Sequence, residues 1–248
     1  MTDTQSKKNI TGLEIITSSF KKGWGAFISN IIVFIVSLLI AALGSILIVT
    51  FAPLWYGFIH MVVKAASGEK VEIKDVFYGF KSVNVFIRSW IYWIITIIVL
   101  IIITTITTLL ASITPILGYI GMFLNFTWIF ITLYMIYIYV MTPSENIIYA
   151  YKESFNLFKK NIVITIIAYI VTYILSIIGM LLLGVGLLIT VPISLLFTTF
   201  VLKTITRNET KTETSYGIVH CRNCGASNYR EDLLEELEKC EYCGTSFK

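Results

Sequence analysis

The sequence predicts an all-α membrane protein: a polytopic bundle of six transmembrane helices followed by a small zinc ribbon. Three observations support this fold class. The 248 residues are 56% hydrophobic and 14% charged, whereas soluble domains carry about 25% charged residues. Three runs, at 23–63, 89–144 and 161–202, contain no Lys, Arg, Asp or Glu. Four cysteines gather near the end of the chain in two spaced pairs.

Each uncharged run is long enough for two spans, because one span needs roughly 20 apolar residues. Glycine and proline divide the runs at 41–45, 114–121 and 181–186. Continuous apolar segments favour helices, which satisfy their own backbone in lipid, and "WIITIIVLIIITT" lacks the alternation of a transmembrane barrel. The spans are therefore predicted near residues 26–43, 46–63, 85–110, 119–141, 162–183 and 187–203.

The basic residues predict the orientation of the bundle. They cluster before the first span, at 64–88, at 142–160 and after the last span, and the three breaks carry no charge. In a six-span arrangement all four clusters fall on one side, which the positive-inside rule makes cytoplasmic. We therefore expect a multi-pass protein of the cell membrane with both termini in the cytoplasm. The first span is expected to stay as an uncleaved anchor, since no cleavage site follows it.

An internal repeat is predicted from the spacing of Phe-Lys pairs and prolines. The distances from the phenylalanine to the following proline are 33, 35 and 34 residues. This spacing favours three parallel units, each an interfacial segment followed by a helix hairpin. The pairs are Phe20 and Pro53, Phe80 and Pro115, and Phe158 and Pro192.

Two of the predicted interfacial segments have apolar residues at helical spacing. The first places Ile10, Leu13, Ile16 and Phe20 on one face. The second does the same with Ile147, Ile148, Tyr151, Phe155 and Phe158, with Ser144 as its helix cap. Such helices can lie among lipid headgroups with their lysines toward anionic lipid. The alternative is a soluble connector helix packed on the floor of the bundle.

The chain divides into a six-span domain at 1–206, a polar linker at 207–217 and a zinc-ribbon domain at 218–248. The ribbon is predicted from four cysteines in the pattern C-x2-C-x15-C-x2-C, a spacing typical of structural zinc sites. Four thiolates close a tetrahedral shell, so the ion would have a structural role. The expected ligands are Cys221, Cys224, Cys240 and Cys243.

Other interpretations of the tail stay open. The cysteine pairs could form two disulfides or a redox pair, although a cytosolic location keeps thiols reduced. Iron in a rubredoxin-like site has the same ligand spacing as zinc. His220 is a spare metal ligand next to Cys221. A capping-box pattern at Asn228 and Glu231 predicts a short helix between the cysteine pairs.

Polar candidates inside the spans are few. His60 lies in the second span, where an ionisable side chain is a candidate for a transport or proton role. Asn125 in the fourth span is expected to make a hydrogen bond between helices. The sequence contains no nucleophile with its base, paired carboxylates or phosphate loop that we recognise. We therefore expect a protein that is not an enzyme.

The stretch at 52–82, "APLWYGFIHMVVKAASGEKVEIKDVFYGFKS", resembles an uncharacterised six-helix family of Firmicutes integral membrane proteins. That family is related to the membrane domain found beside glycerophosphodiester phosphodiesterases. "NIIYAYKESFNLFKKN" and "GVGLLITVPISLLFTTFV" resemble its later motifs, so the likeness covers residues 10–205. The tail resembles zinc ribbons appended to many bacterial membrane proteins. The resemblance implies a structural likeness and supplies no catalytic residues.

The sequence thus favours a membrane scaffold or accessory module that sits in the lipid bilayer and docks a protein partner through its cytosolic ribbon. The alternative is a component of a small-molecule or lipid transporter or channel. A third interpretation, a membrane anchor for a lipid-phosphodiester enzyme, rests on the resemblance alone. No nucleic-acid partner is expected, because the basic residues lie in short loops beside apolar runs.

Overall fold

The computed structural model describes residues 12–144, 146–182, 185–215, 218–220 and 227–229, with side chains up to residue 207. The chain divides into two compact units, residues 1–202 and 203–248. The helices of the described residues are α1 (Gly12–Ser29), α2 (Ile31–Gly44), α3 (Ile48–Ala66), the 3-10 helix η1 (Ile73–Phe80), α4 (Val83–Ile113), α5 (Pro115–Thr132), α6 (Met135–Met141), α7 (Ile147–Lys160), α8 (Ile162–Leu181) and α9 (Leu187–Ser215).

The helical fold predicted for the bundle is confirmed. Within the described residues, five helical stretches are long and apolar enough to cross a membrane, and a bent pair makes a sixth if it is counted as one span. The five are α3, α4, the stretch Ile116–Met141 that joins α5 and α6, α8, and the first part of α9. Their positions agree with the five spans predicted after residue 45.

The first predicted span is wrong in detail. A single helix over 26–43 was expected, but α1 ends at Ser29 and α2 starts at Ile31, with a bend of 86° between them. Asn30 separates the helices because its φ of −133° is not helical. With 14 residues, α2 is about 21 Å long, shorter than the roughly 30 Å hydrocarbon core.

The breaks between the later spans lie where glycine and proline predict them. Helix α5 begins at Pro115, a position where a missing N–H costs nothing, and the Thr114 hydroxyl accepts from the amide of Leu117. Pro53 and Pro192 differ, because each is the sixth residue of its helix. The first and third predicted units therefore have their prolines at the same position of a helix, whereas the proline of the second unit lies at a helix start. The threefold repeat stays a prediction.

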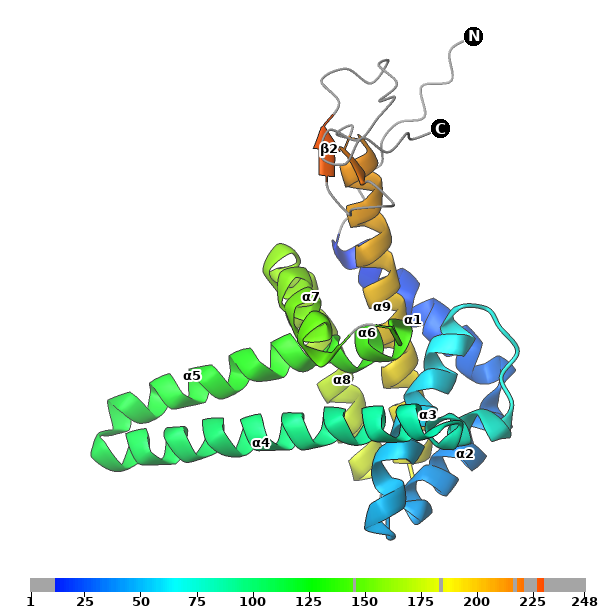
Figure 1. The fold of residues 1–248 in the computed structure, drawn as a ribbon, viewed down its shortest axis with the longest axis horizontal. Helices are drawn as coiled ribbons and strands as arrows, with labels where there is room; N and C mark the ends of the chain where they lie inside the picture. Colours follow the sequence, from blue (N-terminus) through cyan, green and yellow to red (C-terminus); the bar gives the residue numbers. More distant parts are fainter. Residues whose placement is uncertain (1–11, 145, 183–184, 216–217, 221–226, 230–248) are drawn as a thin grey trace. The chain divides into compact units, whose positions relative to one another are not determined.

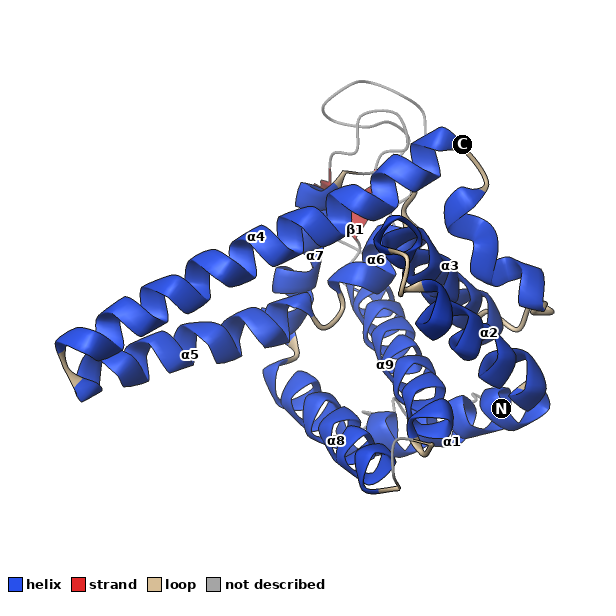
Figure 2. Cartoon of the chain, turned by 90° about the horizontal axis from the view of Figure 1, so that it is seen from below, coloured by secondary structure: helices blue, strands red, loops and turns tan. Residues whose placement is uncertain are grey.

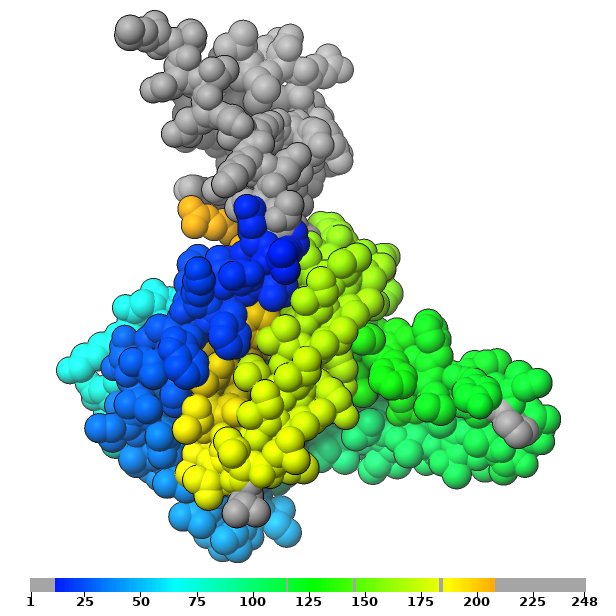
Figure 3. All heavy atoms as spheres, turned by 180° about the vertical axis from the view of Figure 1, so that it is seen from behind, coloured from blue at the N-terminus to red at the C-terminus, as the bar shows by residue number. Residues whose placement is uncertain are grey.

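Helices α3 and α9 bury most of their membrane-crossing residues, whereas the middle of α4 is exposed. Helix α1 packs against α9 at Gly23, where a β-carbon would lie 3.1 Å from the Phe197 amide nitrogen. Helices α1 and α8 lie side by side on the face of the molecule seen in Figure 3. The core of the first unit is thus built around α3 and the first part of α9.

The predicted apolar faces of α1 and α7 coincide with the buried faces only in part. Helix α1 buries Ile15, Ile16, Ser19, Gly23 and Phe27. Leu13 is instead 72% exposed. Helix α7 buries Ala150, Ser154 and Leu157. Small and large residues therefore share the packed faces, and several large apolar side chains, among them Leu13, are exposed.

Two local features of α7 explain how it is held. Its cap is Asn146 rather than Ser144, since the Asn146 Oδ1 accepts from the Tyr149 amide at 2.9 Å. The buried hydroxyl of Ser154 donates to the carbonyl of Ile131 on α5. The prediction of a helix here is confirmed, and its place among lipid headgroups stays a prediction.

Helices α4 and α5 run side by side as a long hairpin, as Figures 1 and 2 both show. The expected interhelical bond of Asn125 is confirmed, because its amide donates to the Thr107 hydroxyl at 2.6 Å. Gly121 lies directly against Thr107 and leaves no room for a β-carbon. This small-residue contact lets the two helix backbones approach closely.

The second unit contains an antiparallel pair of strands, β1 (Ile218–His220) and β2 (Ser227–Tyr229). In their register His220 faces Ser227 and Ile218 faces Tyr229. Helix α9 continues to Ser215, so most of the predicted linker at 207–217 is helical. Asn228 and Tyr229, predicted to open a short helix, belong to β2. Residues 230–239 of that predicted helix lie outside the described residues.

Candidate functional site

The predicted zinc ligands Cys221, Cys224, Cys240 and Cys243 all lie outside the described residues. His220, the spare ligand, belongs to strand β1. Within the part of the chain that the structure describes, there is no group of three or more residues that could hold a metal ion. The zinc site and its iron alternative therefore stay predictions from the cysteine spacing.

The described residues bring their polar side chains together around α3, η1, the start of α4 and the end of α6. Two glycines allow the close contact between α3 and η1. Gly57 on α3 lies against the main-chain carbonyl of Val76, and Gly79 on η1 lies against the carbonyl of Pro53. A β-carbon at either position would overlap the facing backbone. Helix η1 is therefore fixed on α3 backbone to backbone.

An ion pair also joins α3 and η1. The Lys64 Nζ donates to the Asp75 Oδ2 at 2.9 Å, and the amide of Glu72 donates to the same oxygen at 2.9 Å. Burial alone would raise the pKa of Asp75, but the Glu72 amide and the Lys64 ammonium outweigh it and lower that pKa. The Asp75 carboxylate is thus held in its ionised form at neutral pH.

His60 lies next to this pair. Its imidazole stacks on the Tyr78 ring with centroids 3.7 Å apart and planes 3° apart. Its buried Nδ1 has no hydrogen-bond partner among the described residues. The ring therefore joins α3 to η1 by stacking, and its predicted transport or proton role is neither supported nor contradicted.

Arg88, in the second turn of α4, ties three elements together. Its Nη2 donates to the carbonyls of Tyr139 and Thr142, both at 2.7 Å, and its Nε donates to the Tyr56 hydroxyl at 3.3 Å. The guanidinium carbon lies 3.7 Å from the centroid of the Tyr139 ring. Because the carbonyl end of a helix carries partial negative charge, Arg88 stabilises the end of α6.

This role of Arg88 was not predicted from the sequence. The residue was counted only among the basic residues that predict the orientation. An arginine inside a predicted span is a usable signal, since charge in the membrane is costly and nearly always partnered. Its partners could not be found in the same way, because two of them are main-chain carbonyls more than 50 residues away.

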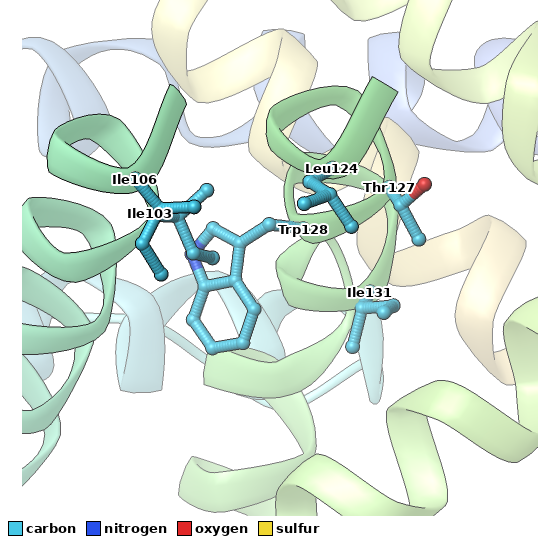
Figure 4. Close-up of a pocket in the computed structure, with 6 residues that line it drawn as sticks. All are labelled: Ile103, Ile106, Leu124, Thr127, Trp128 and Ile131. Carbon is cyan, nitrogen blue, oxygen red and sulfur yellow. The ribbon is translucent and has the colours of Figure 1, made fainter. Parts of the chain in front are cut away.

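Residues of α4 that the structure describes line two cavities. One of about 400 Å³ lies beside Arg88, between α4 and the segment that joins α6 to α7. The other, of about 200 Å³, lies between α4 and α5. Figure 4 shows that Trp128 reaches across it from α5 toward Ile103 and Ile106 on α4. The smaller cavity is lined almost wholly by apolar groups and suits a hydrocarbon chain.

None of the three comparisons, with protein-family models, with curated proteins and with solved structures, finds a match to this chain. Its function is therefore inferred from its own residues.

Proposed function

We propose that this chain is a non-enzymatic membrane scaffold or accessory protein whose cytosolic tail binds zinc and docks a protein partner. The observation that carries the proposal is that the four-cysteine segment follows directly on the helix that contains the last span. Helix α9 runs from the last span to Ser215 as one helix, and the four-cysteine segment follows a few residues later. A small metal-stabilised module has little core of its own and suits recognition of a partner better than chemistry.

The proposed location rests on the exposed residues of α1 and α7. Helix α1 exposes Trp24 and Ile28 together with Lys21 and Lys22. Helix α7 exposes Ile148 and Tyr149 at its start and two lysines at its end. Aromatic and aliphatic side chains beside lysines suit the boundary between hydrocarbon and headgroups. These residues support the proposal that both helices lie among headgroups, and the distribution of lysines favours the cytoplasmic face of the cell membrane.

The non-enzymatic part of the proposal rests on what the polar side chains of the spans do. Arg88 binds the end of α6, Lys64 pairs with Asp75, and Asn125 joins α4 to α5. Each makes contacts that hold helices together. Such use of polar groups is typical of helix packing in membranes.

Affinity capture of the full chain from membranes tests the docking function. We compare the natural chain with a Cys221→Ser, Cys224→Ser double variant, and use Ser246→Ala as the control within the tail. A specific protein retained by the natural chain and by Ser246→Ala, and lost with the double variant, supports the proposal. The same set of proteins from all three chains contradicts it.

A transporter component is the second candidate, favoured by a row of buried hydroxyls along α9. Thr190, Ser194 and Thr198 are four residues apart and share one face, and the Thr198 hydroxyl lies 3.5 Å from that of Thr172 on α8. Ser194 and Thr198 also donate to carbonyls of their own helix, as packing residues do. Solute flux in proteoliposomes that falls in Thr198→Val would favour transport.

A further inference from the structure

We propose that the cavity between α4 and α5 holds part of one acyl chain of a membrane phospholipid. The cavity has a volume of about 200 Å³ and is open to its surroundings. An apolar cavity of about 150 Å³ already binds benzene, so this volume accepts a stretch of hydrocarbon chain rather than a whole lipid. Its walls, which Figure 4 shows, are Ile103 and Ile106 on α4 and Leu124, Thr127, Trp128 and Ile131 on α5.

The cavity forms where the facing side chains of the two helices change in size. Toward the tip of the hairpin the helices touch through small residues. A β-carbon on Gly118 would lie 3.1 Å from the Ala111 β-carbon, and one on Gly121 would lie 2.7 Å from the Thr107 methyl group. Away from the tip the facing side chains are large, and the Trp128 ring reaches across from α5 toward α4. Large side chains do not allow the close approach that glycine and alanine allow, so space remains between them.

The lining of the cavity does not suit water. Its two polar side-chain groups are the Thr127 hydroxyl and the Trp128 indole N–H, and the hydroxyl already donates to the Phe123 carbonyl at 2.9 Å. A buried water molecule needs about two to four polar partners. Empty space is also unfavourable, because the atoms around it lose their dispersion contacts. Hydrocarbon makes those contacts without hydrogen bonds, so a hydrocarbon chain is the ligand that this lining favours.

The position of the hairpin indicates where the chain comes from. The apolar 18-residue window of α4 buries none of its residues, and that of the stretch Ile116–Met141 buries 17%. In a membrane both helices are therefore surrounded by acyl chains. The centroid of the Trp128 ring lies 5.9 Å from that of Tyr151 on α7, and the neighbouring Lys152 is exposed. A phospholipid can keep its headgroup beside α7, at the headgroup level proposed above, while one of its chains enters the cavity.

Photolabelling in lipid vesicles tests the site. The full chain is reconstituted with phosphatidylcholine that carries a diazirine on one acyl chain, and irradiation attaches the lipid to the residues that this chain touches. Ile131 is the diagnostic residue, because it lines the cavity but is only 6% exposed. A lipid on the outer surface of the hairpin does not reach it. Tyr119, which is 70% exposed, reports the surrounding lipid, and we expect label at both residues.

A double variant, Ile106→Trp with Leu124→Trp, fills the cavity from both walls. It should lose the label at Ile131 and keep the label at Tyr119. Both replaced side chains are partly exposed, at 43% and 44%, so the larger indoles can be accommodated without disturbing the core. Circular dichroism checks that the variant keeps its helices.

The matched control is the double variant Ile101→Trp with Met122→Trp. These two residues are 59% and 51% exposed. With 3.6 residues per turn, each lies on the side of its helix away from the cavity-lining Ile103 and Leu124, respectively. The control adds the same two indoles to the same helices and should be labelled like the natural chain.

Label at Tyr119 without label at Ile131 in the natural chain would show that no acyl chain enters the cavity, and it would overturn the proposal. Undiminished label at Ile131 in the filled variant, or its loss in the control, would do the same. Absence of label from both residues would show that the hairpin lies outside the bilayer, which also contradicts the proposal. None of these results bears on docking by the tail, which affinity capture tests separately.

Discussion

The ammonium group of Lys64 on α3 lies 2.9 Å from the carboxylate of Asp75 on η1. Their side chains are only 25% and 12% exposed, respectively. Asp75 accepts a second bond from the Glu72 amide, which opens η1. The carboxylate of Asp75 thus caps the start of η1 and also binds η1 to α3 through Lys64.

Replacing Asp75 by Asn should destabilise the bundle by about 1–3 kcal/mol, because the change leaves a partly buried ammonium without its anion. Thermal unfolding in detergent at pH 7, followed by circular dichroism, measures the effect. Lys70→Gln is the control, since Lys70 is 86% exposed and lies 4.0 Å from its partner Glu72. Equal melting of Asp75→Asn and the natural chain would show that η1 is held without this pair.

The same contact predicts a pH dependence. The pKa of Asp75 is lower in the fold than its ordinary value of 3.8, so its stabilisation is complete above that value. It is lost as the pH falls through the lower folded pKa. The difference in melting temperature between the natural chain and Asp75→Asn should therefore be constant from pH 7 to pH 5 and shrink in stronger acid. A difference that grows on acidification would contradict this assignment.

The glycine contacts predict a steric effect. Gly57→Ala and Gly79→Ala should each destabilise the fold by about 1–3 kcal/mol, the usual cost of overpacking, because each β-carbon meets facing backbone. Gly25→Ala is the matched control, since nothing lies within 4 Å of its β-carbon. In the middle of α1 that change should stabilise by about 0.5–1 kcal/mol. Chemical unfolding monitored by tryptophan fluorescence compares the three variants.

The tail should bind about one zinc ion per chain through its four cysteines. Elemental analysis of the full chain purified under reducing conditions measures the metal. Cys240→Ser should lose the zinc and leave the far-ultraviolet helix signal of the spans almost unchanged. Iron in place of zinc would support the rubredoxin-like alternative. A chain without metal, or with disulfides across the cysteine pairs in the reduced cytosol, would show that the pairs serve another purpose.

Both termini should lie in the cytoplasm. Reporter fusions at residues 1 and 248 measure this directly: a fluorescent protein that matures only in the cytosol should be bright at both ends. A fusion inserted at the break between α4 and α5, next to Thr114, should report the opposite side. A bright signal at Thr114, or a dark one at either terminus, would overturn the orientation taken from the lysines.

The helices were largely predictable and their packing faces were not. Uncharged runs locate spans because lipid requires continuous apolar helices. The same lipid removes the contrast that identifies a buried face in water, since a side chain meets apolar surroundings on either side. Leu13 and Ile16 were therefore placed on one apolar face, yet Leu13 is exposed and Ile16 is buried together with the small Ser19 and Gly23. Apolarity alone does not mark the packed face, because both large and small residues lie on it.

Contacts made through the backbone also escaped prediction. The docking of η1 depends on Gly57 and Gly79, whose partners are carbonyl groups. Arg88 likewise binds the carbonyls of Tyr139 and Thr142. Every residue has a carbonyl group, so nothing in the amino-acid letters distinguishes these partners. The contact of Asn125 was easier to predict, because a lone amide in a span needs a partner on a neighbouring helix.

The packing of α1 on α9 has a consequence for how the protein is made. Gly23 and Phe197 are 174 residues apart in the sequence, yet their backbones are in contact. At about 5–20 residues per second, the ribosome reaches Phe197 only after Gly23 has waited roughly 9–35 seconds for its partner. A chain released early would display the uncovered small-residue face of α1. The cell's proteases could use that face to distinguish an unfinished copy from a complete one.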